Sequence, residues 1–246
     1  GGDGDDNINT GSGNNIIDGG TGNDKINAGG GNNSILGGDG TDTITTGTGN
    51  NIIDGGNDND KITTTGNGSN TITGGTGNDT INAGGGADSI DGGSGNDVIN
   101  AGGGDNTIIG GDGNDTLSAD GGNNSVDGGS GNDGITVTGA GNNTLIGGVG
   151  NDTINAGGGA DSIDGGDGND TINAGDGNNT VAGGDGNDSI TAGTGHDNID
   201  AGAGNDTVRA GAGNDTIMGG SGSDQLYGES GNDIIDAGSD NDSVYG

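Results

Sequence analysis

The sequence predicts an all-β repeat fold built from short strands and tight turns, and three observations support this. A nine-residue phrase, GGxGxDxUx with U an aliphatic residue, runs from Gly1 through the chain as 27 consecutive units. The U position is Ile, Leu or Val in every unit. A second period of eighteen residues lies on top of the first. Repeats of this length are typical of solenoids, in which each unit stacks on its neighbours to bury a continuous core.

The nine positions of a unit are numbered here as slots one to nine. Slots seven to nine, x-U-x, match a very short strand, because side chains alternate along a strand and U then points inward. Slots one to six match a turn, because Gly in slots one, two and four lets the backbone adopt a positive φ that strains residues with a Cβ. Two units, 64–73 and 137–146, have ten residues, which predicts a bulge in their turns.

Slot six separates the units into two rows. All 14 odd-numbered units carry Asp there and form what we call the odd row: Asp6, Asp24, Asp42, Asp60, Asp79, Asp97, Asp115, Asp133, Asp152, Asp170, Asp188, Asp206, Asp224 and Asp242. The 13 even-numbered units form the even row and carry Asp five times, at Asp88, Asp161, Asp197, Asp215 and Asp233. The other eight carry Asn, as at Asn15, Asn33, Asn51 and Asn106. One coil therefore comprises two units, with a uniform carboxylate row on one side and a mixed row on the other.

A longer period predicts a single continuous roll over residues 1–246, assembled from tandem blocks at 1–73, 74–146 and 147–246. The segment GNDTINAGGGADSIDGG occurs at 77–93 and again at 150–166. Such duplication lengthens a structure without changing its chemistry, which suits a structural segment better than an active site. The chain lacks an initiator Met, and whether it is a segment of a longer protein stays open.

Composition makes cations the natural partners of this chain. Its 38 acidic and three basic residues, with a net charge of −35, disfavour nucleic acid and anionic membranes. No apolar run is long enough for membrane insertion. Only 22% of residues are hydrophobic, and burying one aliphatic side chain per unit cannot offset the entropy of ordering a glycine-rich chain. We therefore expect cation binding to supply folding energy, and an oxygen-only site of carboxylates and carbonyls favours Ca²⁺ over Mg²⁺.

The units GGTGNDKIN, GGDGTDTIT and GGDGNDSIT resemble the repeats-in-toxin (RTX) nonapeptide over essentially the whole chain. The resemblance implies a right-handed parallel β-roll of about 13 coils, with two short strands and two turns per 18 residues and Ca²⁺ between equivalent turns. It implies that the ligands are the slot-six Asp residues of both rows, with backbone carbonyls of glycine-slot residues such as Gly20, Gly22, Gly38, Gly40, Gly75, Gly77, Gly93, Gly95, Gly111 and Gly113. It also implies an extracellular or cell-surface protein, exported by type I secretion, that folds on meeting calcium.

Counting the gaps between stacked turns predicts roughly 15 to 25 bound Ca²⁺ ions. The odd row has 13 gaps flanked by Asp, whereas the even row has two, at 197/215 and 215/233. Fifteen ions would change the net charge from −35 to −5, and filling all 25 gaps would leave +15. Asn can offer Ca²⁺ a neutral oxygen or stack in an amide ladder without metal, and both alternatives stay open. We expect the odd row to be the stronger calcium row.

Two units depart from the glycine pattern at slot four, where Asp58 and Asp240 stand. Asp tolerates a positive φ better than most residues, and either carboxylate can add a ligand. The predicted calcium sites that these substitutions change are those of Asp60 and Asp242.

The leading functional prediction is non-enzymatic: a secreted, calcium-binding structural or adhesive segment of a surface layer, filament or adhesin stalk. The alternative is the C-terminal secretion and folding module of a larger RTX toxin or secreted hydrolase. Ice or mineral binding through outward Thr and Asn ranks third, because Lys25 and Lys61 interrupt the Thr column of slot seven. No catalytic residues are expected: the only His, His196, occupies a variable turn slot, and no nucleophile–His–carboxylate set is present.

Slot nine of the odd row changes character near the C-terminus, where it becomes Arg209, Tyr227 and Tyr245. Residues eighteen apart are expected to stack on successive coils and face outward. Two interpretations stay open: sequence drift, or a contact surface for self-association or a neighbouring domain.

Overall fold

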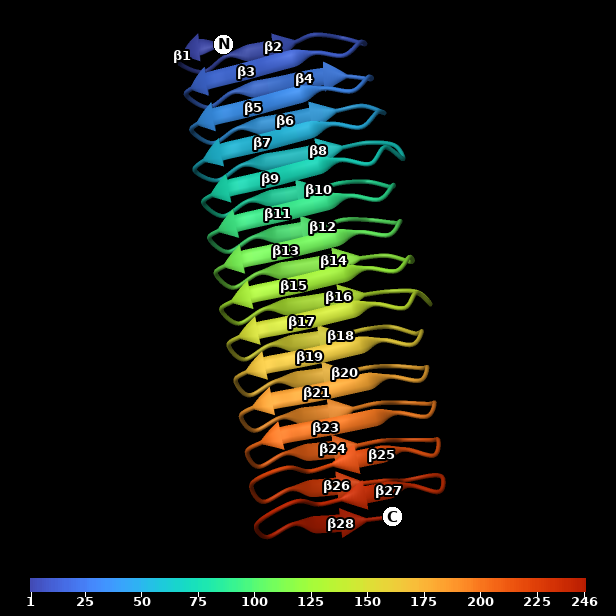
Figure 1. The fold of residues 1–246 in the computed structure, drawn as a ribbon. Coiled ribbons are helices and arrows are strands. Elements are labelled where there is room, and N and C mark those ends of the chain that lie inside the picture. Colours follow the sequence, from blue (N-terminus) through green and yellow to red (C-terminus); the bar gives the residue numbers. More distant parts are fainter. The chain divides into compact units, whose positions relative to one another are not determined.

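The structure, a computed structural model, describes all 246 residues and consists of strands and turns without a helix. The strands belong to two compact units, residues 1–120 and 121–246, which are built alike. In each unit, odd-numbered and even-numbered strands form two separate parallel sheets, and their arrows point in opposite directions in Figure 1. The all-β parallel solenoid predicted from the repeats is confirmed.

Unit 1 contains seven strands in each sheet. The odd-numbered strands are β1 (Gly2–Asp3), β3 (Ile16–Thr21), β5 (Ser34–Asp39), β7 (Ile52–Asn57), β9 (Thr71–Thr76), β11 (Ser89–Ser94) and β13 (Thr107–Asp112). The even-numbered strands are β2 (Asn7–Asn9), β4 (Lys25–Gly29), β6 (Thr43–Thr46), β8 (Lys61–Thr64), β10 (Thr80–Asn82), β12 (Val98–Asn100) and β14 (Thr116–Ala119).

Unit 2 repeats this arrangement. Its odd-numbered strands are β15 (Ser125–Ser130), β17 (Thr144–Val149), β19 (Ser162–Asp167), β21 (Thr180–Asp185), β23 (Asn198–Ala203), β25 (Thr216–Met218) and β27 (Ile234–Asp236). Its even-numbered strands are β16 (Gly134–Val137), β18 (Thr153–Asn155), β20 (Thr171–Asn173), β22 (Ser189–Thr191), β24 (Thr207–Arg209), β26 (Gln225–Tyr227) and β28 (Ser243–Tyr245).

Strand pairing aligns equivalent slots of successive coils. Ile17 of β3 lies beside Ile35 of β5, an offset of eighteen residues. The offset becomes nineteen across a ten-residue unit, where Ile53 pairs with Ile72. The extra residue of unit 64–73 lies in the turn between β8 and β9, so the register resumes unchanged, as the prediction of a bulged turn requires.

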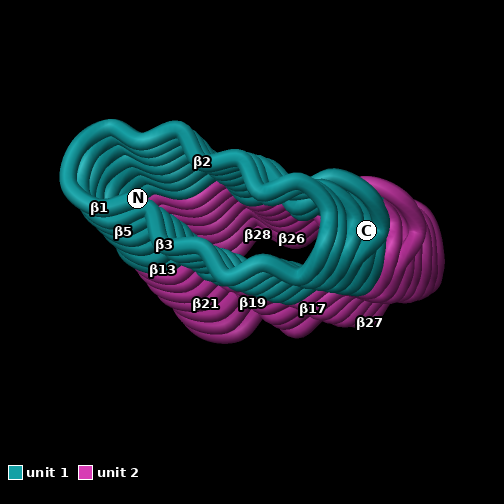
Figure 2. The backbone as a smooth tube through the Cα atoms, turned by 90° about the horizontal axis from the view of Figure 1, so that it is seen from above, with its two compact units in different colours: residues 1–120 teal, residues 121–246 magenta.

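The slot-eight aliphatic residues form the core between the two sheets. Ile44 and Ile62 have no exposed surface, and the same slot is buried through most of both units. In Figure 2 the coils of unit 1 (teal) form a flattened ring with one sheet on each long side, so these side chains meet across the ring. Val244 in β28, over which no further strand packs in the structure, is 50% exposed.

The strands are longer than slots seven to nine on one side of the coil. The odd-numbered strands of both units, except β1 and the three-residue β25 and β27, continue through slots one to three of the next repeat, where slots two and three pair with the adjacent coil. The turns of the odd row consequently shrink to slots four to six, as in the three residues between Thr21 and Lys25. Turns of six residues, expected from the sequence, are therefore wrong for the odd row, because slots one to three belong to the strand and slots two and three pair with the adjacent coil.

Slot four has the positive φ that the turn requires in all units except those of Gly68, Gly141 and Gly213. Gly22 has φ of 114°, and Asp58 and Asp240 at this slot have φ of 75° and 85°. Slot one differs: Gly19 and its equivalents do not have a φ in the left-handed region, so the prediction that glycine serves positive φ there is wrong. The reason for glycine at slot one lies in the metal centre.

Candidate metal centre

Slot six is the innermost polar position of every turn. Of the nineteen predicted Asp ligands, sixteen are buried and three, Asp6, Asp233 and Asp242, are half-buried. In the odd row each carboxylate is held by a neighbouring coil, since the Asp24 backbone N–H donates to Oδ1 of Asp42 at 2.7 Å and the Asp42 N–H donates to Oδ1 of Asp60 at 2.7 Å. One oxygen of each carboxylate is thereby fixed in place by the backbone.

The second carboxylate oxygen, Oδ2, is buried and receives no hydrogen bond. This holds in the odd row for Asp24, Asp42, Asp60, Asp79, Asp97, Asp152, Asp170, Asp188, Asp206 and Asp224, and in the even row for Asp88, Asp161, Asp197 and Asp215. An ionised carboxylate can only accept, and a buried charge without a partner is strongly disfavoured. A column of such oxygens therefore calls for a cation.

Slot-one glycines leave a space beside these oxygens. A Cβ added at Gly55 would lie 2.5 Å from Oδ2 of Asp60 and 2.5 Å from the carbonyl oxygen of Gly74. A Cβ at Gly92 would lie 2.5 Å from Oδ2 of Asp97 and 2.6 Å from the carbonyl oxygen of Gly110. Any side chain at slot one would therefore overlap these two oxygens, and glycine is the residue that leaves both of them accessible to an ion.

The protonation equilibria agree with this geometry. Burial raises the pKa of Asp60 to about 7; the hydrogen bond from the Asp42 backbone N–H offsets part of this, and the carboxylates of Asp79 and Asp42 raise the pKa further. Burial likewise raises the pKa of Asp97 to about 6 against its backbone hydrogen bond from Asp79. In unit 2 burial raises the pKa of Asp188, Asp197 and Asp206 to about 6. These sites resist ionisation unless a positive charge joins them.

The Asn residues of the even row form an amide ladder. Nδ2 of Asn33 donates to Oδ1 of Asn51 at 2.9 Å, and Nδ2 of Asn51 donates to Oδ1 of Asn70 at 2.9 Å. The ladder ends on a carboxylate where Asn70 donates to Oδ1 of Asp88 at 2.9 Å, and in unit 2 Asn143 donates to Oδ1 of Asp161 at 2.9 Å. The sequence left open whether Asn offers a neutral oxygen to Ca²⁺ or stacks in an amide ladder, and the structure contains the ladder.

The amide nitrogen indicates which oxygens converge on a slot-six side chain. Nδ2 of Asn70 donates to the slot-four carbonyl of its own turn, Gly68 at 2.9 Å, and lies 3.4 Å from the slot-one carbonyl of the next coil, Ala83. With Oδ1 of Asp88 at 2.9 Å and Oγ1 of Thr64 at 3.2 Å, four oxygens surround this N–H₂ group. Where slot six is Asp, an oxygen without a proton takes the place of the nitrogen. Slot-one and slot-four carbonyls therefore join the carboxylate in a hard, all-oxygen set.

Slot-two carbonyls are engaged in the backbone ladder. The Ser221 N–H donates to the carbonyl of Gly202 at 2.9 Å, and the Ser239 N–H donates to that of Gly220 at 2.9 Å. The predicted glycine carbonyls thus fall into two groups. Those at slot four are Gly22, Gly40, Gly77, Gly95 and Gly113, and those at slot two are Gly20, Gly38, Gly75, Gly93 and Gly111. The slot-four group fits the candidate site better.

Slot one also distinguishes the two rows, and sequence reasoning missed this. The odd row has Gly there in 12 of 14 units, whereas the even row has Ala, Thr or Val in 12 of 13. In the even row this side chain points inward, as for Ala28, Ala83 and Ala101, which have no exposed surface. The even row therefore has less room beside its slot-six residue. The signal was visible in the sequence, but its meaning depends on what lies next to the Cβ.

No place in the structure gathers three or more His, Cys, Asp or Glu side chains that could hold a metal ion by themselves. The candidate sites instead combine carboxylates with backbone carbonyls, as expected for Ca²⁺. The model of the RTX calcium-binding nonapeptide repeat matches residues 1–35, 36–65, 64–99, 100–135, 137–172, 173–208 and 209–244. The chain belongs to this family. As an RTX protein it is a calcium-binding structural module.

No curated protein sequence matches this RTX chain. The structure contains no helix long and apolar enough to cross a membrane. His196 lies at an exposed turn, as predicted, and its Nδ1 accepts a hydrogen bond from the Asn214 N–H at 2.9 Å. It thereby replaces the Asn Oδ1 that accepts the equivalent bond in the next coil of the even row, where Asn214 accepts from the Asn232 N–H at 2.9 Å.

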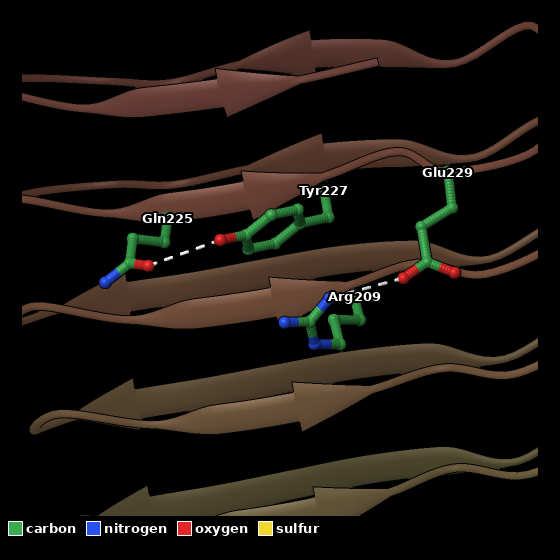
Figure 3. A network of polar contacts seen from close by, with 4 residues as sticks. All are labelled: Arg209, Gln225, Tyr227 and Glu229. Carbon is green, nitrogen blue, oxygen red and sulfur yellow. Dashed lines mark hydrogen bonds and ion pairs between the residues drawn. The ribbon is translucent and has the colours of Figure 1, made fainter.

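The C-terminal residues of slot nine stack on successive coils, as predicted. The guanidinium of Arg209 lies 4.3 Å from the ring centroid of Tyr227, and the rings of Tyr227 and Tyr245 are stacked at 4.6 Å and 7°. Figure 3 shows Arg209 paired with Glu229 at 3.5 Å and the Tyr227 hydroxyl donating to Gln225 at 3.3 Å. These side chains contact one another along the column. Docking of another copy or a neighbouring domain on this column stays a prediction.

Proposed function

We propose that this chain is a secreted structural segment that is unfolded during export and folds into its roll when calcium fills the turns outside the cell. The observation that carries the proposal is the column of buried Oδ2 atoms that no donor reaches. Calcium binding would be folding energy here, because the sites exist only when successive coils are stacked. A role in a surface layer, filament or adhesin stalk follows from the uniform repetition of one structural element.

In this proposal each ion lies between two coils of one unit. Asp97 would contribute Oδ2, Gly95 the slot-four carbonyl of the same turn, and Gly110 the slot-one carbonyl of the next coil. The space that a Cβ at Gly92 would fill, and the amide nitrogens that occupy the equivalent place in the even row, support this set. The other odd-row Asp residues, and the even-row Asp residues predicted as ligands, would contribute Oδ2 in the same way.

The two rows would differ in calcium occupancy. Within each unit the odd row has seven Asp residues and six gaps between them. The amide ladder of the even row already satisfies its own turns, so ions there would concentrate where Asp follows Asp, from Asp197 through Asp215 to Asp233. This supports the lower end of the range of roughly 15 to 25 ions derived from the gap count.

An extracellular location fits the binding chemistry. RTX repeats are typical of secreted proteins. Extracellular calcium modules bind with dissociation constants of about 10⁻⁴–10⁻³ M, which keeps such a chain unfolded inside a cell and folded outside it. Type I export, which the resemblance implies, would use the unfolded state.

The proposal is tested by circular dichroism with and without calcium. We expect a largely unstructured chain in chelator and β-structure in millimolar calcium, and a chain that is fully folded in chelator would refute the proposal. The matched variants Asp60→Ala and Asn51→Ala test the rows. Asp60→Ala removes ligands from the odd row and should lower the number of bound ions in titration calorimetry more than Asn51→Ala does.

A further inference from the structure

The two outward faces of the roll carry opposite charge. We call the outward side of the odd-numbered strands face A and that of the even-numbered strands face B; they are the two long sides of the ring in Figure 2. The strands of face B contain no Asp or Glu in either unit, and they carry every basic side chain of the chain, Lys25 and Lys61 in unit 1 and Arg209 in unit 2.

Face A carries acid and no base. In unit 1 its strands contain Asp3, Asp18, Asp39, Asp54, Asp91 and Asp112, and in unit 2 they contain Asp127, Asp164, Asp167, Asp185, Asp200 and Asp236. In a chain with 38 acidic residues, the exclusion of acid is therefore a property of face B in each unit.

The charges on the two faces of unit 1 share one spacing. On face B, one strand separates Lys25 from Lys61, since both pair with Thr43 of β6. On face A, one strand separates Asp18 from Asp54, since both pair with Leu36 of β5. Neighbouring strands lie about 4.8 Å apart, so the bases and the acids both repeat at about 9.6 Å.

We propose that face B of one molecule docks on face A of a second copy of this chain. The inference rests on the proposed calcium loading: of the 38 acidic residues, 19 are slot-six Asp, and ions between the coils would neutralise them. The remaining acid then lies on face A and in the turns, while face B is weakly basic. Without calcium, a charge of −35 on each molecule opposes any such contact.

The contact is of the head-to-tail type, because the two surfaces that meet are different. Such contacts do not close on themselves and generate layers or filaments. Sheets pack face to face at about 10 Å, and exposed Leu36 (41%) and Ile109 (42%) add apolar area on face A. Seven strands of about three residues cover roughly 340 Å² on each partner, which is less than a stable interface needs. The contact is therefore weak, reversible and sensitive to salt, and it gains strength by repetition.

The test is sedimentation velocity of the full chain in excess calcium, with circular dichroism on every sample. We expect the native chain to associate with itself at low ionic strength and to dissociate in about 1 M salt, where the Debye length falls to about 3 Å while buried ion sites are screened much less. Lys25→Gln/Lys61→Gln should weaken association about five-fold, because two charge pairs are lost. The control Thr41→Glu/Ser69→Glu makes the same change in net charge at exposed turns and should associate like the native chain.

Charge reversal completes the design. Lys25→Glu/Lys61→Glu should fail to self-associate, and Asp18→Lys/Asp54→Lys/Asp91→Lys should self-associate more weakly than the native chain. Their mixture should associate more strongly than either variant alone, because one supplies an acidic face B and the other a basic face A. A native chain that folds in calcium but stays monomeric overturns the proposal and leaves the calcium-dependent fold intact. Association that is lost in Tyr227→Thr/Tyr245→Thr but kept in Lys25→Gln/Lys61→Gln also overturns it, in favour of the aromatic column. Absence of calcium-induced folding would instead overturn the proposed function.

Discussion

Gly92→Ala tests the calcium site with the smallest possible change. The added methyl carbon would lie 2.5 Å from Oδ2 of Asp97 and 2.6 Å from the carbonyl oxygen of Gly110. Both distances are far below van der Waals contact, so the methyl group pushes these two proposed ligand oxygens out of position. The φ of Gly92 lies outside the left-handed region, so the effect of alanine comes from this overlap and not from the φ of residue 92.

The expected loss is one ion and the stability that it supplies. At a calcium concentration about 100-fold above the dissociation constant, one site contributes about 2.7 kcal/mol to the free energy of unfolding. Replacing glycine by alanine returns about 0.4–1 kcal/mol by restricting the unfolded chain. The variant should therefore be about 2 kcal/mol less stable than the native chain in calcium.

Gly103→Ala is the matched control, because a Cβ there would meet nothing within 4 Å and the residue has no left-handed φ. Bound calcium is counted by elemental analysis after dialysis, and stability is measured by urea denaturation in the same buffer. If Gly92→Ala binds as many ions as Gly103→Ala and unfolds at the same urea concentration, the two oxygens beside Gly92 do not hold an ion and the proposed ligand set is wrong.

Three further predictions concern the ladder, pH and metal selectivity. Asn51→Asp removes the amide that donates to Gly49 and Asn70 and buries another charge, so it should raise the calcium concentration needed for half-maximal folding. The control Asn50→Asp changes an exposed residue and keeps its acceptor oxygen, so it should leave that concentration unchanged. Equal folding midpoints for the two variants would contradict the ladder. In calcium-free buffer, β-structure should increase on acidification, because the pKa of Asp60 rises from 3.8 to about 7 on folding. The stability that protonated Asp60 contributes is complete below pH 3.8 and is lost as the pH rises through 7. A circular dichroism signal that stays constant over this pH range would argue against the effect. Mg²⁺ should replace Ca²⁺ poorly at equal concentration, because it requires a strict octahedron, and equal folding midpoints by circular dichroism would count against calcium selectivity.

The sequence by itself determined the strands, the core and the rows. A nine-residue period with an aliphatic residue in every unit places Ile26 and Ile44 inward on successive coils, and the slot-six pattern separates Asp24 from Asn33. These features follow from local rules, since the alternation of a strand and the turn preference of glycine act within one unit.

Only the tertiary structure decided how the rows differ and why. Asp60 and Gly74 are fourteen residues apart, and Asn51 and Asn70 nineteen, yet each pair meets across one gap between coils. Three features of the site depend on how successive coils stack: the Oδ2 without a donor, the amide in the equivalent place of the even row, and the room beside a slot-one glycine. Composition and spacing cannot predict which atom of a side chain faces which carbonyl. The separation of acid from base on the two faces has the same origin, because it appears only when residues eighteen apart are stacked into sheets.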